Sequence, residues 1–252
     1  MTGRLEGKVA IITGGASGFG LGIVEKFLQE GAKVLIMDLS KENGDKVISQ
    51  LATENAKFIQ SDVSKSEDWK KALKTVLDLW GKVDTVVNNA GTCYPNKPSL
   101  TVTEQDFDKI FNVNVKGVYH SFDVVLPQML EQKTGGSFIQ ISSTAALRPR
   151  PGLTWYNATK GAVSIASKSM AVEYGPQQVR FNCICPVAGE TPLLATFLGE
   201  DTPERREAFK KTVPIGRFSK PSDIANSTAF LASDEAEFVT GVDLEVDGGR
   251  CV

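Results

Sequence analysis

The chain has 252 residues, of which 41% are hydrophobic and 23% are charged, and a formal net charge of −2. This composition predicts a globular protein, and a single α/β domain can reach this length. The small net charge and the lack of long like-charge runs predict no nucleic-acid partner, and no apolar run approaches the roughly 20 residues of a membrane helix, which predicts no membrane partner.

Cysteine and histidine are sparse. The cysteines stand at positions 93, 183, 185 and 251, and His120 is the single histidine. No Cys-x-x-Cys pair occurs, whereas a zinc site needs about four Cys, His or carboxylate ligands at suitable spacing. We therefore predict no metal site, no disulfide framework and a cytoplasmic location, and we interpret His120 as a packed helix residue. Residues 1–8 lack the pattern of a signal peptide, so none is expected.

The N-terminal part of the chain predicts a βαβ unit. An apolar run at 8–13 leads into a glycine-rich turn at 14–20, a helical pattern at 21–30, and a second apolar run at 33–37. Such a crossover is right-handed, and its glycine turn and helix N-terminus can bind a pyrophosphate through backbone N–H groups. The spacing differs from the usual Gly-x-Gly-x-x-Gly. The expected cofactor residues in this turn are Gly14, Ser17, Gly18, Phe19 and Gly20.

Asp38 ends the second predicted strand and favours NAD over NADP. A carboxylate at this position binds the free 2′-hydroxyl of the adenosine ribose and repels a 2′-phosphate. Leu39 follows without charge and is a further expected cofactor residue. The alternative, that Asp38 caps the helix predicted over 40–51, is less favoured because Ser40 is the better-placed cap.

Two further strand ends carry candidate cofactor residues. The third strand, at 58–61, ends at Asp62 and Val63, where Asp62 could bind the adenine amine and Val63 could pack on the ring. A helix over 67–79 and a fourth strand at 83–87 follow. Adjacent asparagines at the end of this strand can bind neighbouring backbone, and a glycine there leaves room for the cofactor. This places Asn89, Ala90 and Gly91 in the site.

The segment 107–130 predicts one long helix with Asn114 in its middle. Asparagine is unfavourable inside a helix, so we expect its side chain to organise a backbone carbonyl or a water. An exposed asparagine without such a role is the alternative.

Tyr156 and Lys160 are the candidate proton-transfer pair. They lie four residues apart at the start of a helix predicted over 157–172, so their side chains share one face. A neighbouring cation lowers the pKa of a phenol, and a phenol that exchanges its proton near neutral pH is a general acid or base. Ser143, just beyond a predicted strand at 138–141, can bind the same substrate oxygen. A surface Tyr–Lys pair without catalytic role is the alternative.

The rest of the chain completes the alternation of strands and helices. A strand at 179–185 precedes a loop and charged helix at 186–211, and a helix at 221–232 precedes a last strand at 241–246. We predict one α/β domain over residues 1–252, a doubly wound parallel sheet (Rossmann fold) of seven strands with helices on both faces. The long segment after the strand at 179–185 is of a kind that often covers a binding site, so we predict that residues at about 187–215 form a lid.

Over essentially its full length the sequence resembles the short-chain dehydrogenases/reductases. The shared motifs are Thr-Gly-Gly-Ala-Ser-Gly-Phe-Gly at 13–20, Asn-Asn-Ala-Gly at 88–91, Asn114, Ser143, Tyr156-x-x-x-Lys160 and the closing Val-Asp-Gly-Gly.

The resemblance implies the roles of the catalytic residues. Tyr156 is the general acid/base, Lys160 lowers its pKa and holds the nicotinamide ribose, Ser143 orients the substrate oxygen and Asn114 supports a water in the proton relay. Hydride passes between a substrate carbon and nicotinamide C4. Members are often homotetramers that pair through two long helices, and the small residues of 158–170 suit such packing.

One motif departs from the family pattern of Pro-Gly-x-Ile/Val-x-Thr. Here Pro186 and Thr191 are kept as expected cofactor residues, but Val187 and Gly189 differ, which puts the nicotinamide contacts in doubt. Trp155 and Leu147 suggest an apolar pocket wall, with Trp155 packed under the helix start as the alternative. The expected substrate residues are Ser143, Ala145, Leu147, Trp155 and Val187, with Cys93, Tyr94 and the segment 190–212 as further lining.

Three functions follow from this interpretation. The first is an NAD-dependent oxidoreductase that acts on a secondary alcohol, sugar or polyol, or on the matching ketone, as a small-molecule substrate. The alternative is a 3-oxoacyl thioester (acyl carrier protein) reductase, a class that generally prefers NADP, which Asp38 opposes. A non-catalytic nucleotide-sensing protein is disfavoured because all four catalytic residues are present.

Overall fold

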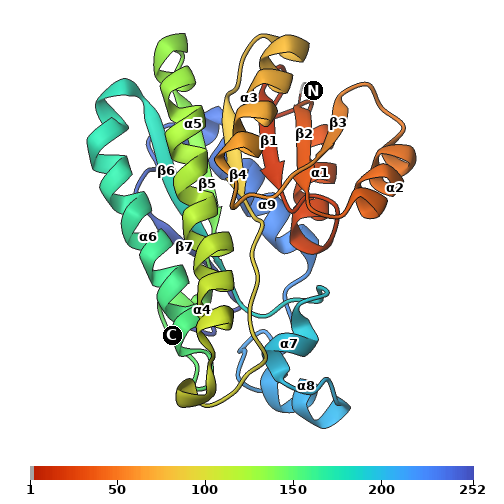
Figure 1. Cartoon of the computed structure of the whole chain (residues 1–252), viewed down its shortest axis with the longest axis vertical. Coiled ribbons are helices and arrows are strands. Elements are labelled where there is room, and N and C mark those ends of the chain that lie inside the picture. Colours follow the sequence, from red (N-terminus) through yellow and green to blue (C-terminus); the bar gives the residue numbers. More distant parts are fainter. Residues whose placement is uncertain (1–2) are drawn as a thin grey trace.

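A computed structural model describes residues 3–252 as a seven-stranded parallel sheet flanked by helices (Figure 1). The strand order β3-β2-β1-β4-β5-β6-β7 confirms the predicted doubly wound sheet of seven strands. The strands are β1 (Val9–Thr13), β2 (Lys33–Asp38), β3 (Ala56–Gln60), β4 (Thr85–Asn88), β5 (Gly136–Ile141), β6 (Val179–Pro186) and β7 (Asp243–Val246).

Helices cover both faces of the sheet. One face carries α1 (Gly18–Gln29), α2 (Lys41–Leu51) and α9 (Pro221–Ala232), and the other carries α3 (Ser66–Trp80), α4 (Glu104–Phe111), α5 (Gly117–Gln132) and α6 (Thr154–Tyr174). Two short helices, α7 (Leu194–Leu198) and α8 (Pro203–Lys210), lie together beyond one end of the sheet (Figure 1).

The central strands are buried on both faces, which explains their continuous apolar sequences. Side chains alternate between two cores: Ile11 of β1 packs with the α3, α5 and α6 layer, and Ile12 packs with the α1, α2 and α9 layer. In the first core, Phe122, Phe138 and Phe181 form an aromatic cluster with ring centroids 5.0–5.4 Å apart. Burial of these side chains on both faces fixes the sheet that carries the site.

The segment 107–130 is helical, as predicted, but its helix contains a π-helical turn. α4 and α5 are separated by a π-helical turn at Asn112–Lys116, which contains the buried Asn114. The Asn114 amide binds backbone and side-chain groups outside its own helix, and an inserted polar group of this kind favours a local widening of the helix. The sequence pattern therefore indicated the helix but not this turn.

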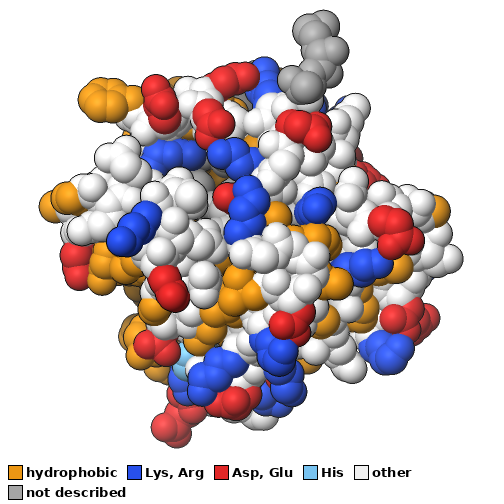
Figure 2. Space-filling model, turned by 90° about the horizontal axis from the view of Figure 1, so that it is seen from above, with side chains coloured by type: hydrophobic (Ala, Val, Ile, Leu, Met, Phe, Trp, Pro, Cys, Tyr) orange, Lys and Arg blue, Asp and Glu red, His pale blue; other side chains and the backbone are white. Residues whose placement is uncertain are grey.

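The sheet order reverses between β1 and β4, and ligands of open α/β sheets bind at the carboxyl ends of strands beside such a reversal. α7 and α8 lie beyond this end of the sheet (Figure 1). Figure 2 shows the opposite end, where basic and acidic side chains are interspersed. Within residues 3–252, no helix is both long and apolar enough to cross a bilayer.

Candidate active site

A cavity of about 530 Å³ lies at the carboxyl ends of the strands. It gathers side chains that are far apart in the sequence, from the turn after β1 to the segment after β6. Most of the predicted site residues line it, namely Gly14, Ser17, Gly18, Phe19, Asp38, Leu39, Asp62, Val63, Asn89, Ala90, Gly91, Ser143, Ala145, Tyr156, Lys160, Pro186, Val187 and Thr191. The predicted residues Gly20, Asn114, Leu147 and Trp155 are not part of this lining.

The turn after β1 presents the N-terminus of α1 to the cavity. Ser17 is the N-cap, but within the described chain its hydroxyl caps no helix N–H, and residues 18–21 contain no acidic side chain. The first N–H groups of the helix and its partial positive charge thus remain available to an anion. These groups fit the pyrophosphate of a dinucleotide.

Gly20 has a structural rather than a lining position. A Cβ atom at this residue would lie 2.0 Å from the carbonyl oxygen of Gly14 and 2.5 Å from Nδ2 of Asn89. Only glycine therefore allows α1 to approach the turn this closely. The expected contact of Gly20 with the cofactor stays a prediction.

Asn89 connects the turn to the end of β4. Its Nδ2 donates hydrogen bonds to the carbonyl oxygens of Thr13 (2.9 Å) and Gly14 (3.1 Å), while its backbone N–H donates to Oγ1 of Thr13 (3.0 Å). Asn88 is buried and donates to Ser121 and Gln140 instead. The predicted binding of backbone by these asparagines is thus confirmed for Asn89, whereas Asn88 binds side chains.

Asp38 faces the same cavity at the end of β2. Its Oδ2 accepts a hydrogen bond from the backbone N–H of Ala16 (3.1 Å), and its Oδ1 accepts one from Ser40 (3.0 Å). Each carboxylate oxygen keeps acceptor capacity for the hydroxyls of a ribose. The Ser40 hydroxyl caps α2 by accepting from Asn43, so Asp38 is not the helix cap.

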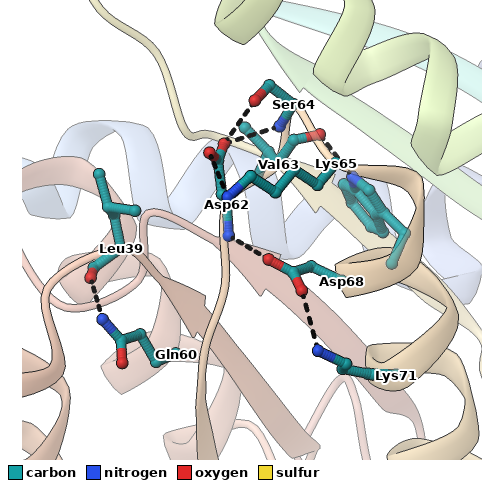
Figure 3. A network of polar contacts seen from close by, with 9 residues as sticks. Leu39, Gln60, Asp62, Val63, Ser64, Lys65, Asp68 and Lys71 are labelled. Atoms are coloured by element: carbon teal, nitrogen blue, oxygen red, sulfur yellow. Dashed lines mark hydrogen bonds and ion pairs between the residues drawn. The ribbon is translucent and has the colours of Figure 1, made fainter.

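Asp62 and Val63 are fixed by a network at the end of β3 (Figure 3). Oδ1 of Asp62 accepts hydrogen bonds from the backbone N–H (3.0 Å) and hydroxyl (2.7 Å) of Ser64. Burial raises the pKa of Asp62, but these hydrogen bonds and Lys65 outweigh it and hold the pKa below its ordinary value. The carbonyl of Val63 accepts from Nε1 of Trp69 (3.0 Å). The Asp62 carboxylate is therefore fixed at the cavity with a lowered pKa, and its expected contact with an adenine amine stays a prediction.

Asn114 joins the π-helical turn to the strand end and to α6. Its Oδ1 accepts from the backbone N–H of Thr92 (2.8 Å), and its Nδ2 donates to the carbonyl of Thr92 (2.9 Å) and to Oγ1 of Thr159 (3.1 Å). The side chain thus organises backbone, as predicted from its place in a helix. It does not line the cavity, and the expected water relay stays a prediction.

Tyr156, Lys160 and Ser143 converge from α6 and from the end of β5. Tyr156 and Lys160 are 6% and 7% exposed, and the Nζ atom of Lys160 lies 5.8 Å from the centroid of the Tyr156 ring. Nζ donates a hydrogen bond to the carbonyl oxygen of Ile141 (2.8 Å), and the Ser143 hydroxyl accepts from the backbone N–H of Ala145 (3.1 Å). The predicted helix spacing therefore places a phenol, an ammonium and a hydroxyl around one space.

The electrostatics of this group differ from the sequence prediction. Burial raises the pKa of Tyr156 well above its ordinary value, and the Ser143 hydroxyl only partly offsets this. Burial also lowers the pKa of Lys160 to about 8. The expected lowering of the phenol pKa by Lys160 was wrong for the chain alone, because desolvation dominates and Lys160, whose hydrogen bond goes to Ile141, does not contribute to the shift.

The segment after β6 explains the departure from the family motif. The backbone of Ala188 and Glu190 pairs with Ser219, and the Ser219 hydroxyl donates to the carbonyl of Val187 (3.1 Å). A Cβ atom at Gly189 would lie 2.3 Å from the ring of Phe19 and 2.6 Å from Oγ of Ser219. A side chain at position 189 would therefore require the Phe19 ring and the Ser219 hydroxyl to move.

Four expected pocket residues lie outside the cavity lining. Leu147 is 39% exposed, and its placement in the pocket was wrong because its loop turns it toward solvent. Trp155 lies edge-on against Phe107 of α4, with ring centroids 5.2 Å apart, but is 38% exposed, so it is neither part of the lining nor buried under the helix start. Tyr94 is buried and its hydroxyl accepts from the backbone of Trp155, while Cys93 binds the carbonyl of Tyr94.

Four residues that the sequence analysis did not single out line the cavity near Tyr156, which we call the substrate end. They come from the loop before α6, from α7 and from α8, and they are Arg150, Leu153, Phe197 and Phe209. Phe197 packs edge-on against Tyr156, with ring centroids 5.2 Å apart. The sequence indicated these residues only indirectly: Phe197 and Phe209 lie in the predicted lid, and Arg150 and Leu153 lie a few residues before Tyr156.

Comparisons with known proteins agree with this geometry. A family model described as enoyl-(acyl carrier protein) reductase matches residues 14–250. The 4-formylbenzenesulfonate dehydrogenase of Comamonas testosteroni is 45% identical over 98% of this chain and 99% of its own length. An NADP-dependent (R)-specific alcohol dehydrogenase of Lentilactobacillus kefiri is 39% identical over 99% of this chain and 98% of its own.

Among solved structures, the 3-ketoacyl-(acyl-carrier-protein) reductase of Brucella melitensis complexed with NADH superimposes with a TM-score of 0.93. It is 42% identical, and the match covers 98% of this chain and 100% of that one. These similarities extend over the whole fold.

Proposed function

Since the chain belongs to the short-chain dehydrogenase/reductase family, we propose that it is an NAD-dependent oxidoreductase. Its substrate is a secondary alcohol, sugar or polyol, or the matching ketone. The observation that carries the proposal is that Tyr156, Lys160 and Ser143 line the same cavity as Asp38 and the N-terminus of α1. Proton-transfer groups and a dinucleotide-binding surface thus share one space.

The residues support a simple division of labour. When bound, the oxidised nicotinamide accepts the hydride that leaves the carbinol carbon. In the reducing direction the Tyr156 phenol gives its proton to the carbonyl oxygen. In the oxidising direction Tyr156 first releases its own proton through the relay, and the resulting phenolate takes the hydroxyl proton, so the alcohol loses one hydride and one proton. The Ser143 hydroxyl donates to the substrate oxygen, and Lys160 lies beside the phenol to hold the nicotinamide ribose. Asn114 supports the water of the proton relay.

The choice of NAD over NADP follows from Asp38. Its carboxylate lines the cavity with acceptor capacity to spare, and the neighbouring Leu39 is 68% exposed and uncharged. A 2′-phosphate would meet a negative charge here. One relative is named as NADP-dependent and one solved neighbour holds NADH, so the proposal of NAD for this chain rests on Asp38 and not on the relatives.

A 3-oxoacyl thioester reductase is the second candidate, favoured by the Brucella melitensis neighbour of that name. The two are separated by comparing reduction of an acetoacetyl thioester with reduction of simple ketones. Higher kcat/KM on the thioester, together with preference for NADPH, would favour this candidate. A nucleotide-sensing protein without turnover is the weakest candidate, because the full catalytic set lines or supports the cavity.

Three further features belong to the proposal. The segment at about 187–215, which contains α7 and α8, acts as a lid of the single domain, since Val187, Phe197 and Phe209 form one wall of the cavity. Exposed Ile165 and Val172 on α6 support assembly into a homotetramer.

A cytoplasmic location is supported by the four free cysteines. Light scattering checks assembly: a mass near four times 27.2 kDa is expected.

The proposal is tested with purified protein and a panel of secondary alcohols, polyols and ketones, assayed by nicotinamide absorbance with both cofactors. The panel includes aryl substrates, because one relative is named for 4-formylbenzenesulfonate. We expect turnover with NAD(H) at higher kcat/KM than with NADP(H). Turnover with NADP(H) alone, or with no member of the panel, would contradict it.

A further inference from the structure

Arg150 is a cation inside the cavity with no partner of its own. It lies in the loop before α6, is half-buried and lines the cavity at the end that holds Tyr156. Among residues 3–252, no carboxylate forms an ion pair with its guanidinium, and its N–H groups donate no hydrogen bond to the protein. A guanidinium has five N–H donors, so all of them remain available to a ligand.

Stacking on an aromatic ring holds the Arg150 guanidinium in place. Its central carbon lies 5.1 Å from the ring centroid of Phe209 in α8, and Phe209 stacks on Phe218 with centroids 5.5 Å apart. A guanidinium stacked on an aromatic ring keeps its N–H edge free for planar, bidentate binding of an anion. Burial and the nearby Arg250 lower the pKa of Arg150, and Cys93 offsets this only in part.

Charge is divided along the cavity. Its only acidic lining residues within the described chain are Asp38 and Asp62, both at the strand ends that suit adenosine. Glu190, an acid in the segment after β6, lines a neighbouring hollow together with Arg206 instead. The space between Tyr156 and Arg150 is walled by Leu153, Phe197 and Phe209, which are apolar. The cavity is also lined by Lys109 and, beside Tyr156, by Lys160, so an anionic substrate would meet cations and no acidic side chain at this end.

We propose that Arg150 recognises an anionic group, a carboxylate or a sulfonate, on an apolar substrate whose alcohol or ketone lies at Tyr156. This inference rests on the proposed oxidoreductase function and names its substrate class. Arg150 binds the end of the substrate that does not react, so it determines specificity and takes no part in proton or hydride transfer.

The test compares three ketones of one shape: 4-acetylbenzoate, 4-acetylbenzenesulfonate and the neutral 4-methylacetophenone. In the parent protein we expect at least one anion to exceed the neutral ketone in kcat/KM by about 30-fold or more, as befits a charge-assisted bidentate contact. The ratio between the two anions identifies the preferred group. Equal kcat/KM for all three ketones would overturn the inference.

Variants separate recognition from support of α8. Arg150→Met keeps the length of the side chain, and we expect it to reduce kcat/KM for the preferred anion by about 100-fold while the neutral ketone changes by less than about 3-fold. Arg150→Lys keeps the positive charge but loses the planar pair of N–H donors, and it should reduce kcat/KM for the preferred anion by about 10-fold. The control, Arg148→Met, removes an exposed arginine bonded to the carbonyl of Arg250, and should change neither substrate. Equal losses on anionic and neutral ketones in Arg150→Met would show a structural role only.

A binding measurement separates this inference from the proposed function. Calorimetry of 4-methylbenzoate and 4-methylbenzenesulfonate, each titrated into protein saturated with NADH, reports anion recognition without turnover. Weaker binding in Arg150→Met than in Arg148→Met supports the inference even if no ketone is reduced, in which case only the oxidoreductase proposal fails. Equal binding in both variants overturns the inference even if the ketones are reduced.

Discussion

The two ends of the cavity are built differently. At the adenosine end, short turns directly after β1, β2, β3 and β4 present the lining groups, and hydrogen bonds fix most of them, as for Asp38 and Asn89. At the substrate end, the wall comes from separate segments, the loop before α6 and the helices α7 and α8, and it consists largely of apolar side chains. The first end is therefore determined locally, whereas the second depends on how distant segments pack.

The strongest test of local determination is Gly20→Ala. Its new Cβ would clash with the Gly14 carbonyl, and we expect a loss of about 1–3 kcal/mol in the free energy of unfolding together with weaker NADH binding. Denaturant titration and calorimetry measure the two effects. Gly175→Ala is the control, because no atom lies within 4 Å of its Cβ position. Equal behaviour of the two variants would show that the turn tolerates a side chain.

A second change tests the charge at the adenosine end. Asp38→Asn keeps the size of the side chain but removes the repulsion of a 2′-phosphate, so the ratio of kcat/KM with NAD to that with NADP should fall about 30-fold, or roughly 2 kcal/mol. Asp45→Asn, which only breaks an exposed ion pair with Lys41, is the control. An unchanged ratio in Asp38→Asn would refute the role of this carboxylate.

Lys160 is a buried lysine in the cavity lining. Its burial predicts that the stability of the fold depends on pH. Its pKa of about 8 in the folded chain lies below the ordinary value of 10.5, so the unfolded chain binds more protons between these values and stability rises with pH there. Compared with Lys160→Met, the parent should gain up to about 1.4 kcal/mol per pH unit from pH 8 to 10.5. Denaturant titrations across this range measure it, and parallel curves would contradict the burial of a titrating lysine.

The smallest expected effects distinguish wall from support at the substrate end. Phe197→Leu removes an aromatic ring from the cavity beside Tyr156, and KM for an aryl ketone should rise by a few-fold, about 1 kcal/mol. Trp155→Leu removes the contact with Phe107 and should lower the melting temperature without changing KM. The reverse pattern, with KM altered only in Trp155→Leu, would show that Trp155 and not Phe197 contacts the substrate.

The contrast between the two ends also explains what the sequence could predict. Strand ends and glycine turns place their residues through local geometry, so Asp38, Asp62 and Asn89 could be located from the alternation of strands and helices. Leu147 and Trp155 were wrongly placed because the direction of a loop side chain depends on what packs beside it, here Phe107 of α4 for Trp155. The division of the helix at Asn114 depends on bonds to Thr92 and Thr159, which the helical pattern does not encode.

The pKa of Tyr156 was mispredicted for a related reason. The spacing of Tyr156 and Lys160 indicates that a cation is near, but the depth of burial that desolvates both groups emerges only from the packed fold. Arg150 likewise reaches the cavity through its contact with Phe209, more than 50 residues later in the chain.

The central claim, that one cavity joins cofactor binding to proton transfer by Tyr156, is tested most directly by Tyr156→Phe. This change removes one oxygen from a buried side chain. We predict that NADH binding stays within about 3-fold of the parent, while kcat for the best alcohol falls at least about 1,000-fold, within the range for loss of a general acid/base. A Tyr156→Phe protein that binds NADH and keeps the parent kcat would contradict the account.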